Sequence, residues 1–372
     1  MRVLILANND GGLYKFRKEL LSEFLFPGSY IKGRDATPCE VYISLPNGEF
    51  VPELESMGCK FIDTPLERHG INPFQELKLR NLYKKIIFDV KPDIVFSYTI
   101  KPNIYGGMAC RFLKVPCVMN ITGLGTAVEN DGLMQKFMLV LYKLALPGAR
   151  KVFFQNNMNE QFFADFKLAL GKHDMLPGSG VNLDYYTVSE YPPEDTIEFA
   201  FISRIMKEKG IDQYLHAAKV IRQKYPQTRF HVYGSCESEY DGKLQRFLDD
   251  DTVIYHGFVK DMDTIYRKTH CIVHPTYYPE GMSNVLLEAS ASGRPIITTN
   301  RSGCREVIDD GVNGFIVKQK ESADLIEKIE RFIKLPYEAK KAMGLAGRAK
   351  VEKEFDRRIV VRKYLEELNR GL

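Results

Sequence analysis

Short apolar runs alternate with longer stretches of helical periodicity along the first half of the chain. Runs that are rich in β-branched and aromatic residues and bounded by turn formers predict strands, and the longer stretches between them predict helices. The predicted strands of this half cover residues 2–7, 40–45, 60–63, 93–98, 116–120 and 151–155. Strands that alternate with helices are typical of a parallel sheet with helical crossovers. The pattern therefore predicts an α/β domain with a doubly wound sheet.

A second alternation of the same kind begins after a segment rich in turn formers. Gly, Pro, Asn and Asp concentrate in residues 175–184 and 191–195, which we interpret as a linker. The predicted strands after it cover residues 197–203, 229–233, 252–255, 271–274, 295–299 and 314–317. The expected domains are residues 1–190 and 191–356, with a last helix over about residues 357–372 that can pack back on the first domain.

Two doubly wound, Rossmann-like domains predict where ligands bind. A length of 372 residues agrees with two domains of ordinary size. In open α/β sheets, ligands bind outside the carboxyl ends of the strands, and we expect these edges of the two domains to face each other across a cleft. Chemistry is therefore expected in the loops that follow strands.

Composition narrows the classes of function. With 44% hydrophobic and 27% charged residues, the chain has the composition of an ordinary globular protein. The formal net charge of +4 divides evenly between residues 1–190 and 191–372, so neither half has the excess of positive charge expected of a duplex-binding protein. Nucleic acid is not expected as a partner.

Cysteines and apolar segments bear on the compartment. The seven cysteines are scattered and include no C-x-x-C pair, which favours a reducing cytosol. The apolar run before Asn8 is too short for the core of a signal peptide. The longest apolar segment, residues 137–146, has about half the length that a bilayer requires. We therefore expect a cytoplasmic protein that does not cross a membrane.

One predicted helix, over residues 133–146, leaves membrane contact open. It is apolar nearly all round, and Lys136, Lys143 and Arg150 recur every seven residues. Such a helix can rest on a membrane with its cations toward anionic lipid, or it can pack on the sheet with its lysines reaching solvent. We favour the packed helix, and peripheral association with the inner membrane stays a hypothesis.

The loop after the first predicted strand contains two adjacent glycines. Residues 8–13 read N-N-D-G-G-L and lead into a predicted helix. Glycines let a backbone approach a ligand closely, and a helix N-terminus favours an anion. The spacing matches neither G-x-G-x-x-G nor a P-loop. Gly12 is thus a candidate donor-binding residue, and a bare tight turn is the equal alternative.

Two cations follow the first strand of the second domain. Arg204 and Lys209 lie within the sequence S-R-I-M-K-E-K-G, at the end of that strand. There, each can make a charge-assisted hydrogen bond to a diphosphate. The alternative is a solvated run of charges, but the position at a strand end favours a function.

The most specific pattern is P-E-G-M-S-N-V-L-L-E-A, over residues 279–289. If a helix begins near Ser283, its first N–H groups lie between two carboxylates, Glu280 and Glu288, at most about 12 Å apart along the axis. That span is comparable to the distance from a hexose across a diphosphate to a ribose, so one element can meet sugar, phosphates and ribose in turn. The alternative is a helix-start carboxylate and a surface glutamate.

Together these motifs resemble family 4 of the retaining glycosyltransferases, which have the GT-B fold. The matching segments of the second domain are residues 204–210, 280–288, 291–296, 303–308 and 311–315. The first domain is similar more loosely, through residues 11–12, 91–95, 99–106 and 122–125. The chain is similar to bacterial enzymes that build capsule, exopolysaccharide or lipid-linked oligosaccharide.

The resemblance implies a donor site for a nucleotide diphosphate sugar, preferably a UDP-sugar. Arg204 and Lys209 would hold the diphosphate, Glu280 the transferred sugar and Glu288 the ribose. The backbone N–H groups that would meet phosphate and sugar belong to Gly281, Met282, Ser283 and Asn284. Some family members have a histidine in the first-domain loops, where this chain has Ile100 or the loop 123–126.

The expected reaction is retaining, metal-independent transfer of a hexosyl or N-acetylhexosaminyl group to a glycan or a polyprenyl-diphosphate-linked acceptor. Fixed cations and a helix dipole would neutralise the departing nucleotide, so Arg204, Lys209 and Glu280 are the candidate catalytic residues, and neither a metal nor a cofactor is expected. Asp261-Met-Asp263 imitates a metal-binding D-x-D, but we expect it to cap a helix.

Two other classes of function stay open. The same fold can epimerise a nucleotide sugar, which would produce an interconverted sugar nucleotide without any acceptor. The chain can also be a non-catalytic, sugar-nucleotide-binding subunit of a heteromeric glycosyltransferase, which would bind nucleotide tightly and never release UDP.

Overall fold

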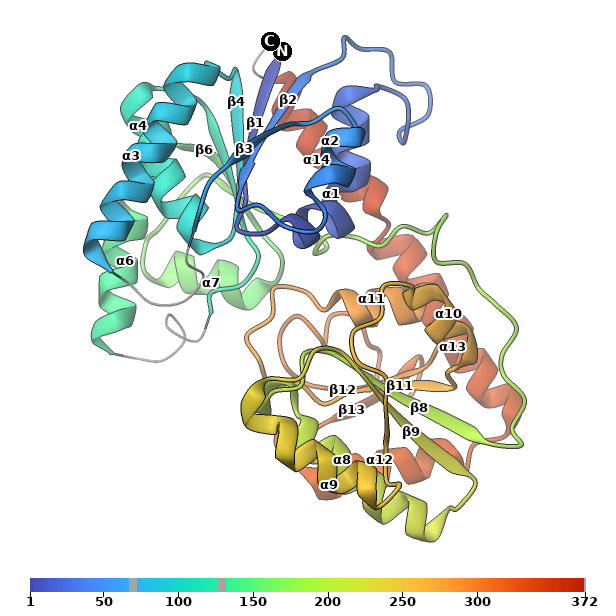
Figure 1. Ribbon diagram of the computed structural model, residues 1–372. Helices are drawn as coiled ribbons and strands as arrows, with labels where there is room; N and C mark the ends of the chain where they lie inside the picture. Colours follow the sequence, from blue (N-terminus) through green and yellow to red (C-terminus); the bar gives the residue numbers. More distant parts are fainter. Residues whose placement is uncertain (67–71, 126–131, 371–372) are drawn as a thin grey trace. The chain divides into compact units, whose positions relative to one another are not determined.

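The chain divides into two compact units. The structure, a computed structural model, describes residues 1–66, 72–125 and 132–370. One unit comprises Met1–Gly180 together with Arg357–Leu372, and the other comprises Val181–Asp356. Figure 1 shows each as a sheet with helices on both faces.

The first unit contains a seven-stranded parallel sheet in the order β3-β2-β1-β4-β5-β6-β7. Its strands are β1 (Arg2–Leu6), β2 (Glu40–Leu45), β3 (Lys60–Asp63), β4 (Ile94–Tyr98), β5 (Cys117–Ile121), β6 (Ala149–Phe154) and β7 (His173–Met175). Its α-helices are α1 (Asp10–Leu25), α2 (Val51–Ser56), α3 (Pro73–Val90), α4 (Gly107–Leu113), α6 (Leu133–Ala145), α7 (Asn157–Asp165) and α14 (Arg357–Asn369). The strand order reverses between β1 and β4, as a doubly wound fold requires.

The central strand β1 contributes to two cores. Successive side chains of a strand point to opposite faces of the sheet. Val3 and Ile5 pack in the core with α1, α2 and α14, whereas Leu4 and Leu6 pack in the core with α3, α4 and α6. A strand that is covered on both faces must be apolar throughout, which explains why its sequence is a continuous apolar run.

The second unit contains a six-stranded parallel sheet in the order β10-β9-β8-β11-β12-β13. Its strands are β8 (Ile197–Ile202), β9 (Thr228–Tyr233), β10 (Ile254–Tyr255), β11 (Cys271–His274), β12 (Ile296–Thr299) and β13 (Gly314–Val317). Its α-helices are α8 (Ile211–Lys224), α9 (Asp241–Asp249), α10 (Met262–Lys268), α11 (Asn284–Ala291), α12 (Ser322–Ile333) and α13 (Tyr337–Glu354). This sheet also reverses its order, between β8 and β11.

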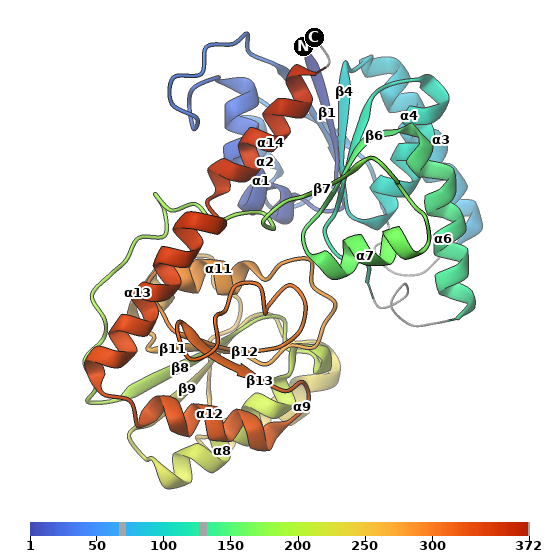
Figure 2. The ribbon, with the colours of Figure 1, turned by 180° about the vertical axis from the view of Figure 1, so that it is seen from behind.

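The last helix, α14, completes the core of the first unit, and Figure 2 shows it beside the sheet of that unit. The ring of Tyr364 packs between Phe96 and Phe153, with centroid distances of 5.3 and 5.2 Å. A buried ion pair of 2.6 Å joins Arg357 at the start of α14 to Glu19 of α1. Residues at the two ends of the chain thus form one core.

Each predicted strand is present, and its ends lie within two residues of the prediction. The short strand β7 was missed, because its sequence, H-D-M, lacks an apolar run. The sequence places the domain boundary at residue 190, whereas the two compact units divide at residue 180. Residues 181–190 pack with the second unit, because Val181 donates a hydrogen bond of 2.8 Å to the Phe355 carbonyl and Arg294 donates one of 2.9 Å to the Glu190 carbonyl.

The helix predicted over residues 133–146 is α6. One side of it is buried, with Met138, Leu139 and Tyr142 in the core of the first unit, so the helix does pack on the sheet. Its other side exposes large apolar side chains, among them Leu133 and Phe137. Among the described helices, none combines the length and the hydropathy that crossing a bilayer demands.

Candidate active site

The loops after β8 and β11 meet at Gly210. This glycine has a φ of +77°, and a Cβ atom on it would lie 2.1 Å from the carbonyl oxygen of Pro275, which follows β11. Only glycine allows this approach without displacing one of the loops. A hydrogen bond of 2.8 Å from the Tyr277 N–H to the Glu208 carbonyl joins the same loops. The contact brings Lys209 beside the loop that carries Glu280.

Lys209 and Glu280 form an ion pair. Lys209 is only 8% exposed, and its ammonium nitrogen lies 4.6 Å from the centroid of the Tyr278 ring. A charge at this depth requires a partner of opposite sign, because an unpaired buried ion is costly. The structure therefore brings together two of the three predicted catalytic side chains.

Arg204, the third of them, lies on the same aromatic ring but nearer solvent. Its guanidinium carbon is 5.7 Å from the ring centroid of Tyr278, and its Nη1 is 3.4 Å from a carboxylate oxygen of Glu237. Neither Tyr278 nor Glu237 was predicted. Two adjacent tyrosines before Glu280 were a visible signal for an aromatic platform, whereas Glu237 comes from the loop after β9 and gave none.

Helix α11 begins after Ser283, as predicted. The Ser283 side chain makes no capping hydrogen bond to the helix, and its hydroxyl oxygen lies 3.4 Å from Nε2 of His274. The first N–H groups of a helix have no acceptor within it, and the helix dipole favours an anion there. Met282 is buried in the core, so it can offer a ligand only its backbone. Asn284, half-buried, holds an Oδ1 atom that has no hydrogen-bond partner among the described residues.

Glu288, one turn further along α11, is held by a buried tyrosine. The hydroxyl of Tyr266 donates a hydrogen bond of 2.9 Å to a carboxylate oxygen of Glu288. Burial, followed by the negative charge of Glu288, raises the pKa of Tyr266 well above its ordinary value, so the hydroxyl keeps its proton. The position of Glu288 is thereby fixed relative to the helix N-terminus.

The loop after β12 supports the residues before α11. The carbonyl of Gly303 accepts a hydrogen bond of 2.8 Å from the N–H of Ser283, and a Cβ atom on Gly303 would lie 3.0 Å from that of Glu280. Glu306 fixes this loop, because its carboxylate accepts hydrogen bonds of 2.7 Å from the Gly303 N–H and 3.0 Å from the Ser302 hydroxyl. All these residues follow strands at the carboxyl edge of the second sheet.

His270 directly precedes β11 and His274 ends it, and both side chains are buried. Burial and then the charge of Lys209 lower the pKa of His274 to about 3, so its ring is neutral. The Nδ1 atom of His270 accepts a hydrogen bond of 3.0 Å from the Glu198 N–H. Asp261 caps α10 by accepting hydrogen bonds from Thr264, as predicted. Within the described parts of the chain, no three potential metal ligands among His, Cys, Asp and Glu are gathered.

Gly12 lies inside a helix rather than in the loop before it. Helix α1 begins at Asp10, and the side chain of its N-cap residue, Asn9, accepts a hydrogen bond from the Gly12 N–H. A Cβ atom on Gly12 would lie 2.7 Å from Oδ1 of Asn9, so the cap itself calls for a glycine. The Gly12 N–H is therefore engaged in the cap, and a donor contact of this residue stays a prediction.

A buried polar network lies at the carboxyl edge of the first sheet. The hydroxyl of Ser97 donates to Oδ1 of Asn103 (2.7 Å), and Nδ2 of Asn103 donates to the carbonyl of Asn120 (2.8 Å). The Asn120 side chain contacts Gln155 at 3.2 Å and the Tyr364 hydroxyl at 2.6 Å. This network was not predicted, although polar residues at the ends of apolar strands were its visible signal.

Ile100 and the loop 123–126 are the two alternatives for the position where some family members have a histidine. A Cβ atom on Gly125 would lie 3.3 Å from Cδ1 of Ile100, so these two segments lie close together. Thr126, the last residue of the predicted loop, lies outside the described residues.

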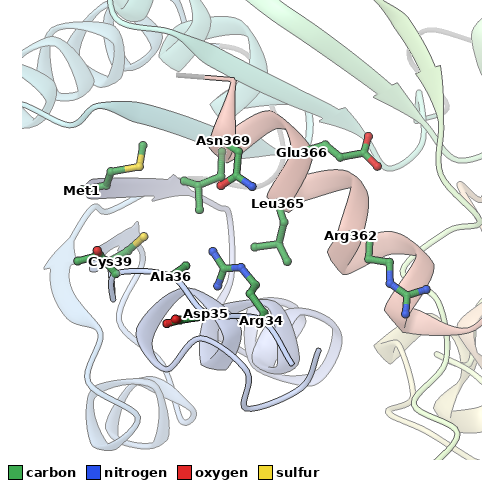
Figure 3. A pocket seen from close by; sticks show the side chains of 11 residues that line it. Met1, Arg34, Asp35, Ala36, Cys39, Arg362, Leu365, Glu366 and Asn369 are labelled. Carbon is green, nitrogen blue, oxygen red and sulfur yellow. The ribbon is translucent and has the colours of Figure 1, made fainter. Parts of the chain in front are cut away.

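One cavity of the first unit lies away from all these residues. It has a volume of 720 Å³ and lies between α14 and the segment before β2 (Figure 3). Arg34, Arg362 and Leu365 are among its lining residues, together with Met1, which directly precedes β1. Met1 marks the amino edge of the sheet, opposite the carboxyl edge where α/β folds bind ligands.

The two doubly wound α/β units have the GT-B fold. A solved structure agrees: Anabaena Alr3699/HepE in complex with UDP-glucose has a TM-score of 0.80 and 18% identity, with both chains covered completely. The family model "Glycosyl transferases group 1" matches residues 188–350, and "Glycosyl transferase 4-like" matches residues 30–156. Between them the two models match most of the chain, which belongs to the group 1, GT4-like glycosyltransferases.

Two relatives cover most of the chain. The N,N'-diacetylbacillosaminyl-diphospho-undecaprenol alpha-1,3-N-acetylgalactosaminyltransferase of Campylobacter jejuni is 25% identical, over 98% of this chain and 97% of its own length. The capsular polysaccharide biosynthesis glycosyltransferase CapM of Staphylococcus aureus is 28% identical, over 80% of this chain and 81% of its own length. The similarity thus extends through both units.

Proposed function

We propose that the protein transfers a hexosyl or N-acetylhexosaminyl group from a UDP-sugar to a polyprenyl-diphosphate-linked sugar, with retention at the anomeric carbon and without a metal, in the synthesis of a cell-surface polysaccharide. The observation that carries this proposal is the Lys209–Glu280 ion pair beside the N-terminus of α11. A diphosphate and a sugar need these two kinds of group side by side.

A bound donor would replace the contact between Lys209 and Glu280 with its own contacts to each of these side chains. Its diphosphate competes for Lys209 and for the first N–H groups of α11, while the sugar hydroxyls donate to Glu280. Arg204 would close over the diphosphate by leaving Glu237, an exchange that costs little because the pair is half exposed. Glu288, fixed by Tyr266, would accept hydrogen bonds from the ribose.

Charge balance favours a route without a metal. When the bond from C1 of the sugar to the phosphate oxygen breaks, negative charge develops on the departing UDP, and fixed cations with a helix N-terminus can stabilise it. The acceptor oxygen would attack C1 from the same face, and its proton would pass to an oxygen of the departing phosphate. This route needs no protein nucleophile, and Glu280 would orient the sugar and stabilise its positive charge.

The acceptor is inferred from the relatives. The name of the Campylobacter enzyme describes transfer to a sugar on diphospho-undecaprenol, and that of CapM describes capsule synthesis. An acceptor of this kind is anchored in a bilayer, so the reaction would take place at the cytoplasmic face of the inner membrane.

Thermal unfolding in EDTA tests the donor site. UDP, GDP, ADP and CMP are compared, each in large excess, with Arg204→Ala and Lys209→Ala as controls. A ligand at about 100 times its Kd adds about 2.7 kcal/mol to the free energy of unfolding, which raises Tm by several degrees. We expect stabilisation by UDP alone, lost in both variants. If no nucleotide stabilises the protein without a metal, metal-independent binding of the diphosphate is wrong.

A further inference from the structure

Helix α6 exposes a continuous apolar row. Leu133, Phe137, Val140 and Leu144 are all exposed, Leu133 to 87% and Phe137 to 44%. Their spacing of four, three and four residues places them on one side of the helix. Single apolar side chains on a surface are ordinary, but an uninterrupted row along a helix indicates an interaction surface.

Exposed aromatic side chains extend this row onto the neighbouring helices. Helix α4 contacts both α3 and α6, on the same side of the first sheet. Phe74 and Phe88 of α3 and Phe112 of α4 are exposed to 85%, 65% and 66%. Figures 1 and 2 both show α3, α4 and α6 together along one side of the unit. We call their outward side the α3–α4–α6 face.

The charges of this face have one sign. The exposed cations of α3 and α6 are Lys78, Arg80, Lys84, Lys85, Lys136 and Lys143. Within the described residues of these two helices and α4, the one exposed carboxylate is that of Asp89, because Glu76 is buried and pairs with Lys101. The ammonium nitrogen of Lys84 lies 3.5 Å from the centroid of the Phe112 ring, so cations and aromatic rings are interleaved.

We propose that the α3–α4–α6 face binds the surface of an anionic bilayer, with the apolar row of α6 inserted among the acyl chains and its lysines at the phosphates. A helix with apolar and cationic side chains on one surface is suited to this interface, because its cations are attracted to the anionic headgroups while its apolar side chains leave water.

A second copy of the chain fits the same face less well. In a symmetric dimer the same patch meets itself, so Lys136 and Lys143 of one copy would face those of the other. Among the described residues of α3, α4 and α6, only Asp89 offers an exposed carboxylate to balance them. Like charges without a partner destabilise such an interface, whereas anionic headgroups neutralise all the cations at once.

The placement has a consequence that rests on the proposed function. Helices α3 and α6 each follow a strand and therefore begin at the carboxyl edge of the first sheet, where Phe74 and Leu133 lie. This is the edge at which α/β folds bind ligands. A bilayer against the α3–α4–α6 face would therefore present a lipid-linked sugar beside that edge.

Flotation with vesicles tests the surface without any turnover. The full-length protein is mixed with vesicles of phosphatidylcholine alone or of phosphatidylcholine with phosphatidylglycerol, at low and high salt. We expect flotation with the anionic vesicles at low salt and less at high salt, because counterions screen the headgroups. Protein that stays at the bottom with anionic vesicles at low salt overturns the proposal.

Two variants and a control locate the contact. Phe137→Ser with Leu144→Ser removes half of the apolar row, and Lys136→Glu with Lys143→Glu reverses two charges. Each should lower the ratio of bound to free protein about tenfold or more. The control, Val312→Ser with Lys353→Glu, changes an exposed apolar and an exposed cationic residue of the second unit and should float like the wild type.

Two further measurements separate the alternatives. If the surface variants float as well as the wild type, the α3–α4–α6 face is not the contact. If sedimentation shows a wild-type dimer that the Phe137 and Leu144 changes convert to a monomer, a second copy is the occupant and the proposal is wrong. Stabilisation of the same variants by UDP, measured without vesicles, reports on the donor site alone and should be unchanged.

Discussion

Glu280 and Lys209 form a pair whose members are expected to differ in function. Lys209 would contact the diphosphate both before and during transfer, whereas Glu280 would act mainly when positive charge develops on the sugar. Glu280→Gln should therefore lower kcat about hundredfold or more and change the Kd for UDP less than threefold. Steady-state kinetics with calorimetric UDP titration check this, and equal losses in turnover and affinity would instead assign Glu280 to ground-state binding.

His274 should make stability depend on pH. Its pKa falls from 6.5 to about 3 on folding, so the unfolded chain binds a proton below pH 6.5 that the folded chain does not. This stability is complete above about pH 6.5 and declines as the pH falls toward 3, with a loss of about 2 kcal/mol at pH 5.

Urea unfolding of the wild type and of His274→Asn checks this dependence. The wild type should lose about 2 kcal/mol more between pH 7 and pH 5 than the variant does, because only the wild type carries the titrating ring. Parallel losses in both proteins would show that other groups account for the acid sensitivity.

Residue-level chemistry was predictable from the sequence where one element carries it. The carboxylates Glu280 and Glu288 flank the start of α11, and that start was read correctly at Ser283. Tyr278 and Glu306 complete the site through loops after two different strands, β11 and β12, and no local pattern indicates which loops meet. The sequence placed Gly12 in the loop before the first helix. In the structure Asn9 caps that helix, which therefore begins at Asp10 and includes Gly12.

At the scale of elements, the approach of two loops at Gly210 can be isolated by a matched pair of substitutions. Gly210 and Gly311 share a φ of +77°, but a Cβ atom would meet the Pro275 carbonyl only at Gly210, and nothing within 4 Å at Gly311. Gly311→Ala should cost about 1 kcal/mol, the strain of the backbone alone. Gly210→Ala should cost more and should also weaken stabilisation by UDP, because Lys209 moves with the loop.

Thermal unfolding of both variants with and without UDP makes the comparison. An equal loss of stability in the two variants, with UDP binding intact, would mean that the loop adapts and that the close approach does not position Lys209.

Elements with long apolar runs were the predictable ones. Strands such as β1 and β4 are buried on both faces of the sheet, so their sequences must be mostly apolar. Their positions could therefore be predicted from hydrophobicity alone. The edge strand β7 has three half-buried residues, so pairing with β6 rather than composition creates it. The sequence of α6 is apolar nearly all round, so its pattern does not indicate which side of the helix is exposed. Only the packing against the sheet determines that side.

At the scale of the whole molecule, one helix from the end of the chain determines whether the first unit is complete. Helix α14 buries five side chains in the core that also contains Val3 and Ile5 of β1, namely those of Val360, Val361, Tyr364, Leu365 and Leu368. The sequence predicts a helix there that can pack back on the first domain, and the contacts of these side chains place it in the core of that unit. The unit division at residue 180 has the same origin, since hydrogen bonds to Phe355 and from Arg294 attach residues 181–190 to the second unit.

Tyr364→Ala tests how much the first unit depends on this helix. The ring is 1% exposed and packs on Phe96 and Phe153, and its hydroxyl bonds Asn120, so truncation leaves both a cavity and an unpaired buried amide. The expected loss is about 3–5 kcal/mol. Glu366→Ala, an exposed position two residues further along α14, should change stability by about 0.5 kcal/mol at most. Calorimetry compares the two variants, and similar small effects in both would mean that the unit folds without the helix.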